Sequence, residues 1–307
     1  MRIAIFGAGG LGGYYGVRLV EAGHEVGFIA RGEHLQAIRG NGLVVKSPLG
    51  DAHLNAVLAS DDPADIGVVD LVIVAVKAWQ IPQVAKDMAP LMGKDTVVVP
   101  FLNGVDAPDG LAAVLGESHV LGGLSKIFSR IESPGEIRHF SPSAYVEIGE
   151  LQGGSSERVR SLGKMFEKAG VDVGISDDIR SALWFKLLMV SSWAGLGALA
   201  RTPLGELRRD VATNALIDRS MEEGIAVGLA CGNKLPGDCR QQLVQFYEAM
   251  PDDATASMQR DLMQGRPSEL EAWNGAIVRF GAQHGVATPV HEFVCSLLRP
   301  MEQRARQ

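Results

Sequence analysis

The stretch Ile3–Gly12 reads IAIFGAGGLG and decides the fold of the first half of the chain. Ile3–Phe6 is a short apolar run that ends at glycine, which is typical of a strand buried on both faces. Leu11–Ala22 then has the apolar spacing of a helix and is followed by Gly23, a favoured C-terminal cap. The chain is therefore expected to open with a strand, a glycine loop and a helix.

The loop itself matches the pattern Gly-x-Gly-x-x-Gly. With 37 glycines in 307 residues such a spacing arises easily by chance, but here it lies between a predicted strand and a predicted helix. Gly7 would permit the tight turn, Gly9 would let a pyrophosphate approach the backbone, and Gly12 would let the helix pack on its strand. Free N–H groups at a helix N-terminus favour an anion. The loop thus predicts a dinucleotide site made of Gly7, Ala8, Gly9, Gly10, Leu11 and Gly12.

Strand and helix patterns alternate through the first half of the chain. The further predicted strands are Glu25–Ala30, Leu71–Val76, Thr96–Leu102, His119–Leu121, Gly135–Phe140, Tyr145–Gly149 and Val171–Ile175. Helix-length segments separate strands, which predicts an α/β fold with a Rossmann-type, doubly wound parallel sheet.

The second half shows almost no strand pattern. Helical spacing is expected over residues 179–199, 211–228, 241–250, 254–263, 268–283 and 290–306. We therefore expect two domains, a nucleotide-binding Rossmann domain over residues 1–176 and an all-α domain over residues 177–307.

Composition excludes several classes of protein. A hydrophobic content of 46% excludes disorder, and the net charge of −7 disfavours a nucleic-acid partner, whose phosphates require a basic face. The three cysteines form no Cys-x-x-Cys pair and the seven histidines lack metal-ligand spacing, so we expect a reduced cytoplasmic protein without a metal. The longest uncharged run, Leu187–Ala200, is shorter than the ~20 residues that span a bilayer, so no membrane contact is expected.

The end of the second predicted strand indicates which dinucleotide binds. NAD enzymes usually carry Asp or Glu there to hold the ribose hydroxyls. This chain has Ile29-Ala30-Arg31-Gly32, and a guanidinium suits the extra phosphate of NADP. NADPH is therefore expected rather than NADH. Two alternatives stay open: Arg31 as a solvated surface charge, and nearby Glu33 as the missing acid.

Polar residues also follow the next two strands of the predicted sheet. Lys77 and Gln80 come after LVIVAV, and Asn103-Gly104 follows the strand after that. Ligands of doubly wound sheets lie at the carboxyl ends of the strands, so Lys77, Gln80 and Asn103 are candidates to face the cofactor. Asn-Gly is also a common turn pair, which explains it without a ligand.

Three residues of the second half are candidates for the chemistry. Lys186 lies within the otherwise apolar ALWFKLLMV, and either reaches the surface or stands in a cleft, where loss of hydration would make it a proton donor. Glu269 and Ser257 flank the turn at residues 264–267. Glu269 also fits a capping box that starts at Ser268, and Ser257 also fits a polar helix position.

Together these segments resemble the ketopantoate reductase (2-dehydropantoate 2-reductase) family over nearly the whole chain. The matching pieces are GAGGLG at 7–12, Arg31, KAWQ at 77–80, Asn103-Gly104, LWFKLL at 183–188, GELRRD at 205–210, SMQRDLMQGRPSELEAWNG at 257–275 and HGVATP at 284–289. The resemblance implies NADPH-dependent reduction of 2-dehydropantoate to pantoate, as in pantothenate biosynthesis. It also implies a Rossmann domain and a helical domain that enclose the substrate.

The resemblance implies a role for each candidate. Lys186 would be the general acid that protonates the carbonyl oxygen. Glu269 would bind the substrate hydroxyl and orient Lys186, and Ser257 would contact the carboxylate. Lys77 and Asn103 would lie where cofactor and substrate meet.

One departure from the family concerns the helix of Lys186. The family usually has asparagine four and eight residues after the lysine, whereas this chain has Val190 and Ala194. Polar pocket groups discriminate strongly between substrates, so a reductase of another 2-oxo acid or of an imine is the alternative. A non-catalytic NADP sensor is a further alternative, and the helical domain is a possible homodimer surface.

Overall fold

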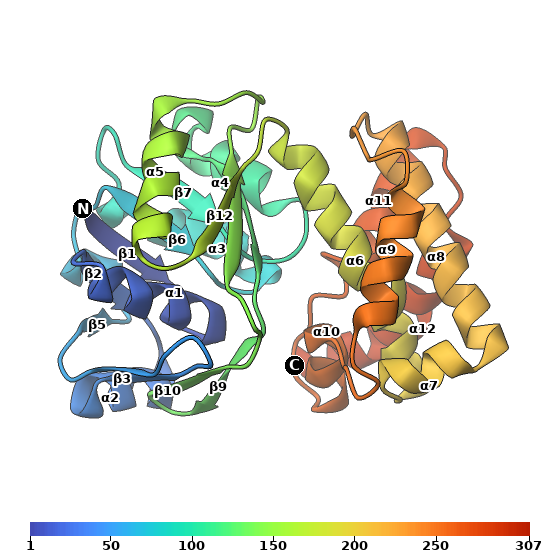
Figure 1. The fold of residues 1–307 in the computed structure, drawn as a ribbon, viewed down its shortest axis with the longest axis horizontal. Coiled ribbons are helices and arrows are strands. Elements are labelled where there is room, and N and C mark those ends of the chain that lie inside the picture. The colour runs from blue at the N-terminus through green and yellow to red at the C-terminus, as the bar shows by residue number, and fades with distance from the viewer. The chain divides into compact units, whose positions relative to one another are not determined.

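The computed structural model describes every residue from Met1 to Gln307, and the chain forms two compact units (Figure 1). The first unit contains Met1–Leu102 and Asp106–Ile179, and the second contains Asn103–Val105 and Arg180–Gln307. The long stretches of the two units therefore meet at Ile179, shortly after the predicted boundary at residue 176. The short segment Asn103–Val105 belongs with the helical unit, although it follows a strand of the first.

A parallel five-stranded sheet forms the centre of the first unit. Its strands, in spatial order, are β5 (Leu58–Ser60), β2 (Glu25–Ile29), β1 (Arg2–Phe6), β6 (Leu71–Val74) and β7 (Val97–Pro100). Every residue of β6 is buried, as expected for a strand covered on both faces. The order of the strands reverses between β1 and β6, and such switch points are where doubly wound sheets bind ligands. The predicted Rossmann-type sheet is confirmed.

Four of the five α-helices of the first unit follow strands of this sheet, and the fifth follows a strand of another sheet. The five are α1 (Gly10–Glu21), α2 (Gly32–Asn41), α3 (Ile81–Asp87), α4 (Ala107–Leu115) and α5 (Glu157–Lys168), with single turns of 3-10 helix at Pro63–Asp65, Ala78–Gln80, Ala89–Leu91 and Glu117–His119. Helix α1 buries Tyr14, Tyr15, Val17 and Leu19 in the core. Gly23 follows α1 with a φ of +88°, which confirms its predicted place after the helix.

Two smaller mixed sheets complete the first unit. One contains β4 (Ala52–Leu54), β3 (Leu43–Lys46), β10 (Glu136–His139) and β9 (Ser129–Ser133), and the other contains β12 (Asp172–Ile175), β11 (Tyr145–Gly149) and β8 (Gly122–Lys126). The prediction of a single parallel sheet is wrong for these strands. Only Pro134 and Gly135 join β9 to β10, which is too short for a parallel crossover, so the pair is antiparallel.

The predicted strand His119–Leu121 is also wrong. The 3-10 turn Glu117–His119 occupies its start, and β8 begins only at Gly122. Val120 forms one isolated bridge with Val98.

The second unit is helical throughout, which confirms the predicted all-α domain. Its helices are α6 (Ile179–Ala200), α7 (Leu204–Arg209), α8 (Val211–Ala230), α9 (Cys239–Ala249), α10 (Ser257–Met263), α11 (Asn274–His284) and α12 (Pro289–Ala305). Trp184, Leu187 and Leu188 of α6 belong to the same buried cluster as Trp273 and Ile277. Helix α6 is long and apolar enough to cross a membrane, but 67% of its most apolar window is buried inside the protein, as in a core helix.

Helix α11 begins at Asn274, later than the predicted start at residue 268. The backbone N–H of Ser268 donates to both carboxylate oxygens of Glu302, at 3.2 and 2.9 Å, and the Ser268 hydroxyl donates to the same carboxylate at 2.5 Å. All of these contacts are buried and join residues far apart in the sequence. A carboxylate of α12 therefore competes with the local capping pattern and holds this segment in turns.

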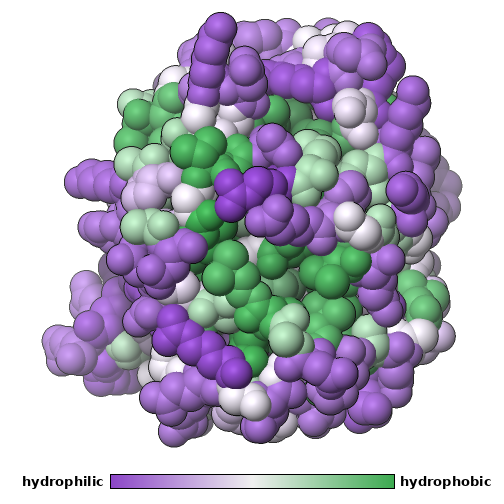
Figure 2. Space-filling model, turned by 90° about the vertical axis from the view of Figure 1, so that its left-hand side faces the viewer, coloured by the Kyte–Doolittle hydropathy of each residue, from purple (hydrophilic) through white to green (hydrophobic).

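The surface of the protein is mixed in character. Figure 2 shows a hydrophobic area framed by hydrophilic residues on the side of the molecule where the N-terminus lies. Large apolar side chains that are exposed in the first unit include Met1, Leu58 and Val68.

Candidate functional site

The glycine loop joins β1 to α1, and its three motif glycines have different surroundings. Gly7 has a φ of +101°, and a Cβ there would lie 2.7 Å from the carbonyl oxygen of Ala75. A Cβ on Gly12 would overlap the carbonyl oxygen of Gly7. A Cβ on Gly9, by contrast, would meet nothing within 4 Å. The outer two glycines are thus needed by the fold, and the middle one leaves an open approach to the backbone.

The start of α1 offers free N–H groups beside that open approach. The first helical bond runs from the N–H of Gly13 to the carbonyl of Gly9, at 2.8 Å, and no side chain caps the helix. The N–H groups of Gly10, Leu11 and Gly12 therefore have no acceptor in the protein. Helix N-termini of this kind bind phosphate groups, so the residues present fit the pyrophosphate of a dinucleotide.

Gly10 has a second role that its place in the motif does not reveal. A Cβ on Gly10 would lie 2.7 Å from the Cα of Arg130 in β9. A Cβ on Gly13 would likewise overlap the side chain of Ile137 in β10. Both glycines therefore let the β9–β10 hairpin pack directly on α1.

Arg31 lies at the end of β2, where the sequence predicts recognition of the 2′-phosphate. It is the N-cap residue of α2, and its side chain is 65% exposed. Its guanidinium lies 3.8 Å from the carboxylate of Asp87 in α3, which is a long and solvated ion pair. Such a pair leaves most of the guanidinium donors accessible. Glu33, the alternative acid, is exposed on the first turn of α2.

His34 connects three segments of this part of the site, and no sequence motif marks it. Its Nδ1 accepts from the backbone N–H of Gly135 at 3.0 Å, so its Nε2 carries the proton and donates to the carbonyl of Ala8 at 2.8 Å. The ring therefore links α2 to the glycine loop and to the β9–β10 hairpin. Only the position of a histidine in the first turn after Arg31 could have pointed to it.

Lys77 and Gln80 follow β6, and Asn103 follows β7. Both Lys77 and Gln80 are half-buried, and the side-chain oxygen of Gln80 accepts from the backbone N–H of Lys77 at 3.0 Å. Gln80 thus shapes the turn that presents Lys77. Asn103 is half-buried as well, but it belongs to the second unit.

Lys186 and Glu269 are both buried in the second unit. Lys186 is 9% exposed, so its side chain does not extend into solvent as one interpretation of the sequence required. Glu269 is 5% exposed and lies in turns before α11, so it is not in the first turn of a helix, as its interpretation within a capping box required. Lys186 and Glu269 therefore share the helical unit with two other buried charged residues, Asp261 and Glu302.

Ser257 is half-buried at the start of α10. The side-chain amide of Gln259 fixes this helix, because it donates to the carbonyls of Gly197 at 3.1 Å and Thr202 at 2.8 Å. Both acceptors lie at or just beyond the C-terminal end of α6, the helix that carries Lys186.

Comparison with known proteins identifies the family. Family models described as Ketopantoate reductase PanE/ApbA and as its C-terminal part match residues 3–153 and 178–302. The 2-dehydropantoate 2-reductase of Mesorhizobium japonicum is 32% identical to this chain over 97% of each. The crystal structure of a PanE/ApbA family ketopantoate reductase from Ralstonia eutropha JMP134 matches with a TM-score of 0.92 and 34% identity, over 100% of both chains.

The chain belongs to the ketopantoate reductase family. It is thus an oxidoreductase that acts on a CH–OH group. A further solved structure, of D-mandelate dehydrogenase with NADH and anilino(oxo)acetate, matches this ketopantoate reductase family member with a TM-score of 0.91 and 26% identity. That match covers 100% of this chain and 99% of the other.

In this ketopantoate reductase family member, sequence patterns do not reveal the contacts of Glu302 and Asn274, because their partners are distant in sequence. Glu302 of α12 binds Ser268, the neighbour of Glu269, and forms an ion pair with Arg306. Asn274 donates to the carbonyl of Ser191 in α6 at 3.1 Å and to the imidazole of His291 at 2.9 Å. Neither contact leaves a local sequence pattern.

Proposed function

We propose that this protein catalyses the NADPH-dependent reduction of 2-dehydropantoate to pantoate, a reaction of pantothenate biosynthesis. The observation that carries the proposal is the burial of Lys186 in the second unit of a ketopantoate reductase family chain. A buried lysine is a suitable general acid, because few water molecules compete for its proton.

Each candidate side chain has one task in this proposal. Lys186 donates its proton to the 2-carbonyl oxygen of the substrate. Glu269 accepts a hydrogen bond from the substrate hydroxyl and orients Lys186. Ser257 and Asn103 donate hydrogen bonds to the substrate, with Ser257 assigned to the carboxylate. Lys77 binds where the substrate and the cofactor come together.

The cofactor is held by the first unit. Gly7, Ala8, Gly9, Gly10, Leu11 and Gly12 form the loop for the pyrophosphate, and Arg31 binds the 2′-phosphate, with Lys77, Gln80 and Asn103 near the nicotinamide. When bound, NADPH supplies the hydride that reduces the carbonyl carbon. The exposed guanidinium of Arg31, at the position where NAD enzymes usually carry Asp or Glu, supports NADPH over NADH.

The test is oxidation of NADPH by the purified protein in the presence of 2-dehydropantoate. We expect turnover that is abolished in Lys186→Ala and strongly reduced in Glu269→Ala. Turnover that is unaffected by Lys186→Ala would contradict the assigned general acid.

A second candidate is the reduction of a different 2-oxo acid or of an imine. Val190 and Ala194 lie one and two helical turns after Lys186, and neither offers the substrate a hydrogen bond. The match to D-mandelate dehydrogenase supports a 2-oxo acid with an apolar substituent. Comparing kcat/KM for 2-dehydropantoate with that for apolar 2-oxo acids decides between the two candidates. A non-catalytic NADP sensor is disfavoured by the burial of both Lys186 and Glu269.

We further propose that the protein is a cytoplasmic homodimer. Its substrate is a small molecule, and we expect neither a nucleic-acid partner nor a membrane partner. Light scattering on the purified protein measures its mass directly. A monomeric mass would contradict the homodimer.

A further inference from the structure

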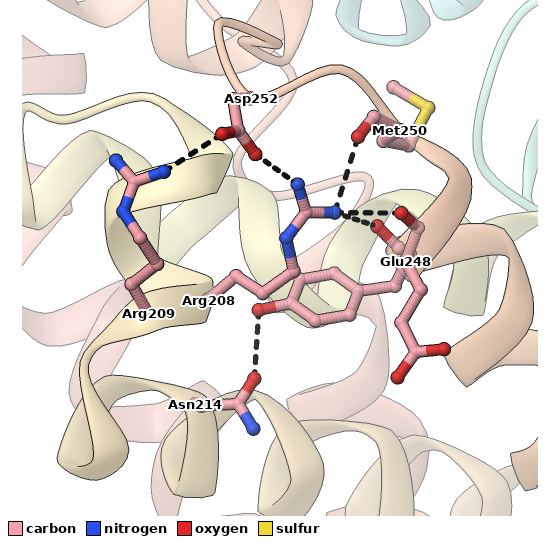
Figure 3. A network of polar contacts seen from close by, with 7 residues as sticks. Arg208, Arg209, Asn214, Glu248, Met250 and Asp252 are labelled. Atoms are coloured by element: carbon pink, nitrogen blue, oxygen red, sulfur yellow. Dashed lines mark hydrogen bonds and ion pairs between the residues drawn. The ribbon is translucent and has the colours of Figure 1, made fainter.

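Arg208 of α7 holds the C-terminal end of α9 (Figure 3). Its Nη1 donates to the backbone carbonyls of Tyr247, Glu248 and Met250 at 2.9, 3.0 and 3.2 Å. Carbonyls at the end of a helix have no partner within the helix and carry a partial negative charge, so a guanidinium stabilises them. The charge also lies over the ring of Tyr247, 5.8 Å from its centroid.

The same guanidinium binds the segment that follows α9. Its other nitrogen donates to the carboxylate of Asp252, which also accepts from Arg209 at 2.8 Å (Figure 3). The backbone adds two contacts between α7 and this segment. The N–H of Gly205 donates to the carbonyl of Asp252 at 2.9 Å, and the N–H of Leu204 donates to the carbonyl of Ala254 at 3.0 Å.

This fixed segment leads directly into Ser257. Only Thr255 and Ala256 separate Ala254 from the first residue of α10. On the other side of Ser257, the Gln259 amide binds the carbonyls of Gly197 and Thr202. Ser257 is therefore held from both sides, by Arg208 through the preceding segment and by the end of α6 through Gln259.

We propose that Arg208 is a positioning residue for substrate binding, which sets the place of the Ser257 hydroxyl without contacting the substrate. The proposal rests on the proposed function, in which Ser257 binds the substrate carboxylate. An arginine is required, because its planar fork binds three carbonyls and a carboxylate at once, whereas a lysine offers a single point of charge.

The experiment is a double-mutant cycle on kcat/KM for the 2-oxo acid. We expect Arg208→Ala to raise KM for the 2-oxo acid about tenfold, because small displacements of a binding group are costly, while the Kd of NADPH changes less than about twofold. In a Ser257→Ala background the same substitution should change kcat/KM by less than about threefold, since residues that act through one another are not additive. Arg208→Lys should restore only part of the lost affinity.

Arg240→Ala is the matched control. Arg240 lies at the other end of α9 and pairs with Asp218 at 3.1 Å and Glu222 at 3.6 Å, both in α8. The substitution removes an exposed arginine from α9, the helix whose other end Arg208 binds, without touching the segment before Ser257. We expect KM to stay within about twofold of that of the unchanged enzyme.

Two kinetic or binding outcomes would overturn the proposal. One is an equal loss of kcat/KM on Arg208→Ala with and without the Ser257 hydroxyl. The other is an equal loss of affinity for NADPH, which would indicate general damage to the fold. If Arg208→Ala does not fold, Asp252→Asn removes the charge with little change in shape and enters the same cycle, where we expect a smaller rise in KM.

The order of measurement separates this proposal from the proposed function. The unchanged enzyme is first assayed with NADPH and a panel of 2-oxo acids, and any acid that is turned over serves for the cycle. No turnover with any acid contradicts the proposed function. The order of the chain at Ser257 is then measured by amide hydrogen exchange at Arg260, whose N–H closes the first turn of α10 on the carbonyl of Ala256 at 3.1 Å. Faster exchange in Arg208→Ala than in Arg240→Ala supports the proposal, and equal exchange overturns it.

Discussion

The glycine loop of the first unit and the segment from Ser257 to Asn274 in the second unit are built in different ways. In the loop, short-range backbone geometry produces the site, since Gly7 and Gly12 are required by contacts with Ala75 and with each other. At the segment, contacts with distant helices replace local geometry: Arg208 of α7 binds the stretch just before Ser257, and Glu302 of α12 binds Ser268. The first kind of site is readable from a motif, and the second is not.

The largest effect is expected from Gly12→Val, which tests the glycine loop. Its side chain would overlap the carbonyl of Gly7, so we expect the free energy of unfolding to fall by at least about 3 kcal/mol. Urea unfolding measures this loss. Gly9→Ala is the control, because its methyl group meets nothing within 4 Å. It should leave stability within about 0.5 kcal/mol and weaken NADPH binding. Undiminished affinity for NADPH would show that the cofactor does not use this open side.

Glu302→Ala tests the segment from Ser257 to Asn274, which is bound by a side chain of the distant helix α12. The substitution leaves the buried N–H and hydroxyl of Ser268 without their acceptor, so we expect a loss of about 2 to 3 kcal/mol in the free energy of unfolding. Because Ser268 precedes Glu269, kcat/KM should fall as well. Glu302→Gln keeps one acceptor oxygen and should lose less on both measures. A variant of unchanged stability and activity would show that the turns around Glu269 form without α12.

A pH titration tests the buried core of the helical unit. Burial lowers the pKa of His291 to about 4. Between that value and the ordinary value near 6.5 the unfolded chain binds the extra proton, so stability falls as the pH drops. From pH 7 to pH 5 this one group should remove about 2 kcal/mol from the free energy of unfolding.

The control for this titration is His291→Gln, which does not titrate but can still bind Asn274 and the Ser220 carbonyl. It should flatten the pH dependence relative to the unchanged protein in urea unfolding at pH 7 and pH 5. Parallel pH profiles would mean that His291 is protonated in the folded state. Burial also lowers the pKa of His139, and that contribution cancels in the comparison.

The smallest effect is expected from Arg31→Ala, at an exposed position at the start of α2. We expect the Kd of NADPH to rise about tenfold, which is about 1.4 kcal/mol, and the Kd of NADH to change little. Fluorescence titration with both cofactors measures the ratio. Equal changes for both cofactors would mean that Arg31 does not read the 2′-phosphate.

The spacing of apolar residues predicted the elements that pack against the core along their whole length. The run LVIVAV became β6, and the apolar spacing after the glycine loop became α1. It did not predict the mixed sheets, because β3 and β4 are short and the pairing of β3 with β10 joins distant segments. The β9–β10 hairpin was not predicted either, because β9 is largely exposed and has no apolar alternation, although Gly10 and Gly13 are required by the packing of the hairpin on α1.

The residues of the candidate site also fall into two groups, those that a sequence pattern marks and those that only the structure shows. The motif marked Gly7, Gly9 and Gly12, and an isolated charge in an apolar run marked Lys186. The local pattern after Pro267 predicted a capping box, yet Ser268 binds Glu302 instead, because the buried carboxylate of α12 offers better-shielded hydrogen bonds than a solvated helix start.

The sequence by itself determined the family, the parallel sheet, the helical second unit and the loop that fits a dinucleotide, because each depends on residues close together in the chain. Only the tertiary structure decided that Lys186 and Glu269 are buried, and that Arg208, Glu302 and His34 bind segments next to the candidate residues. Burial and long-range hydrogen bonds depend on which helices pack together, and no local pattern records that.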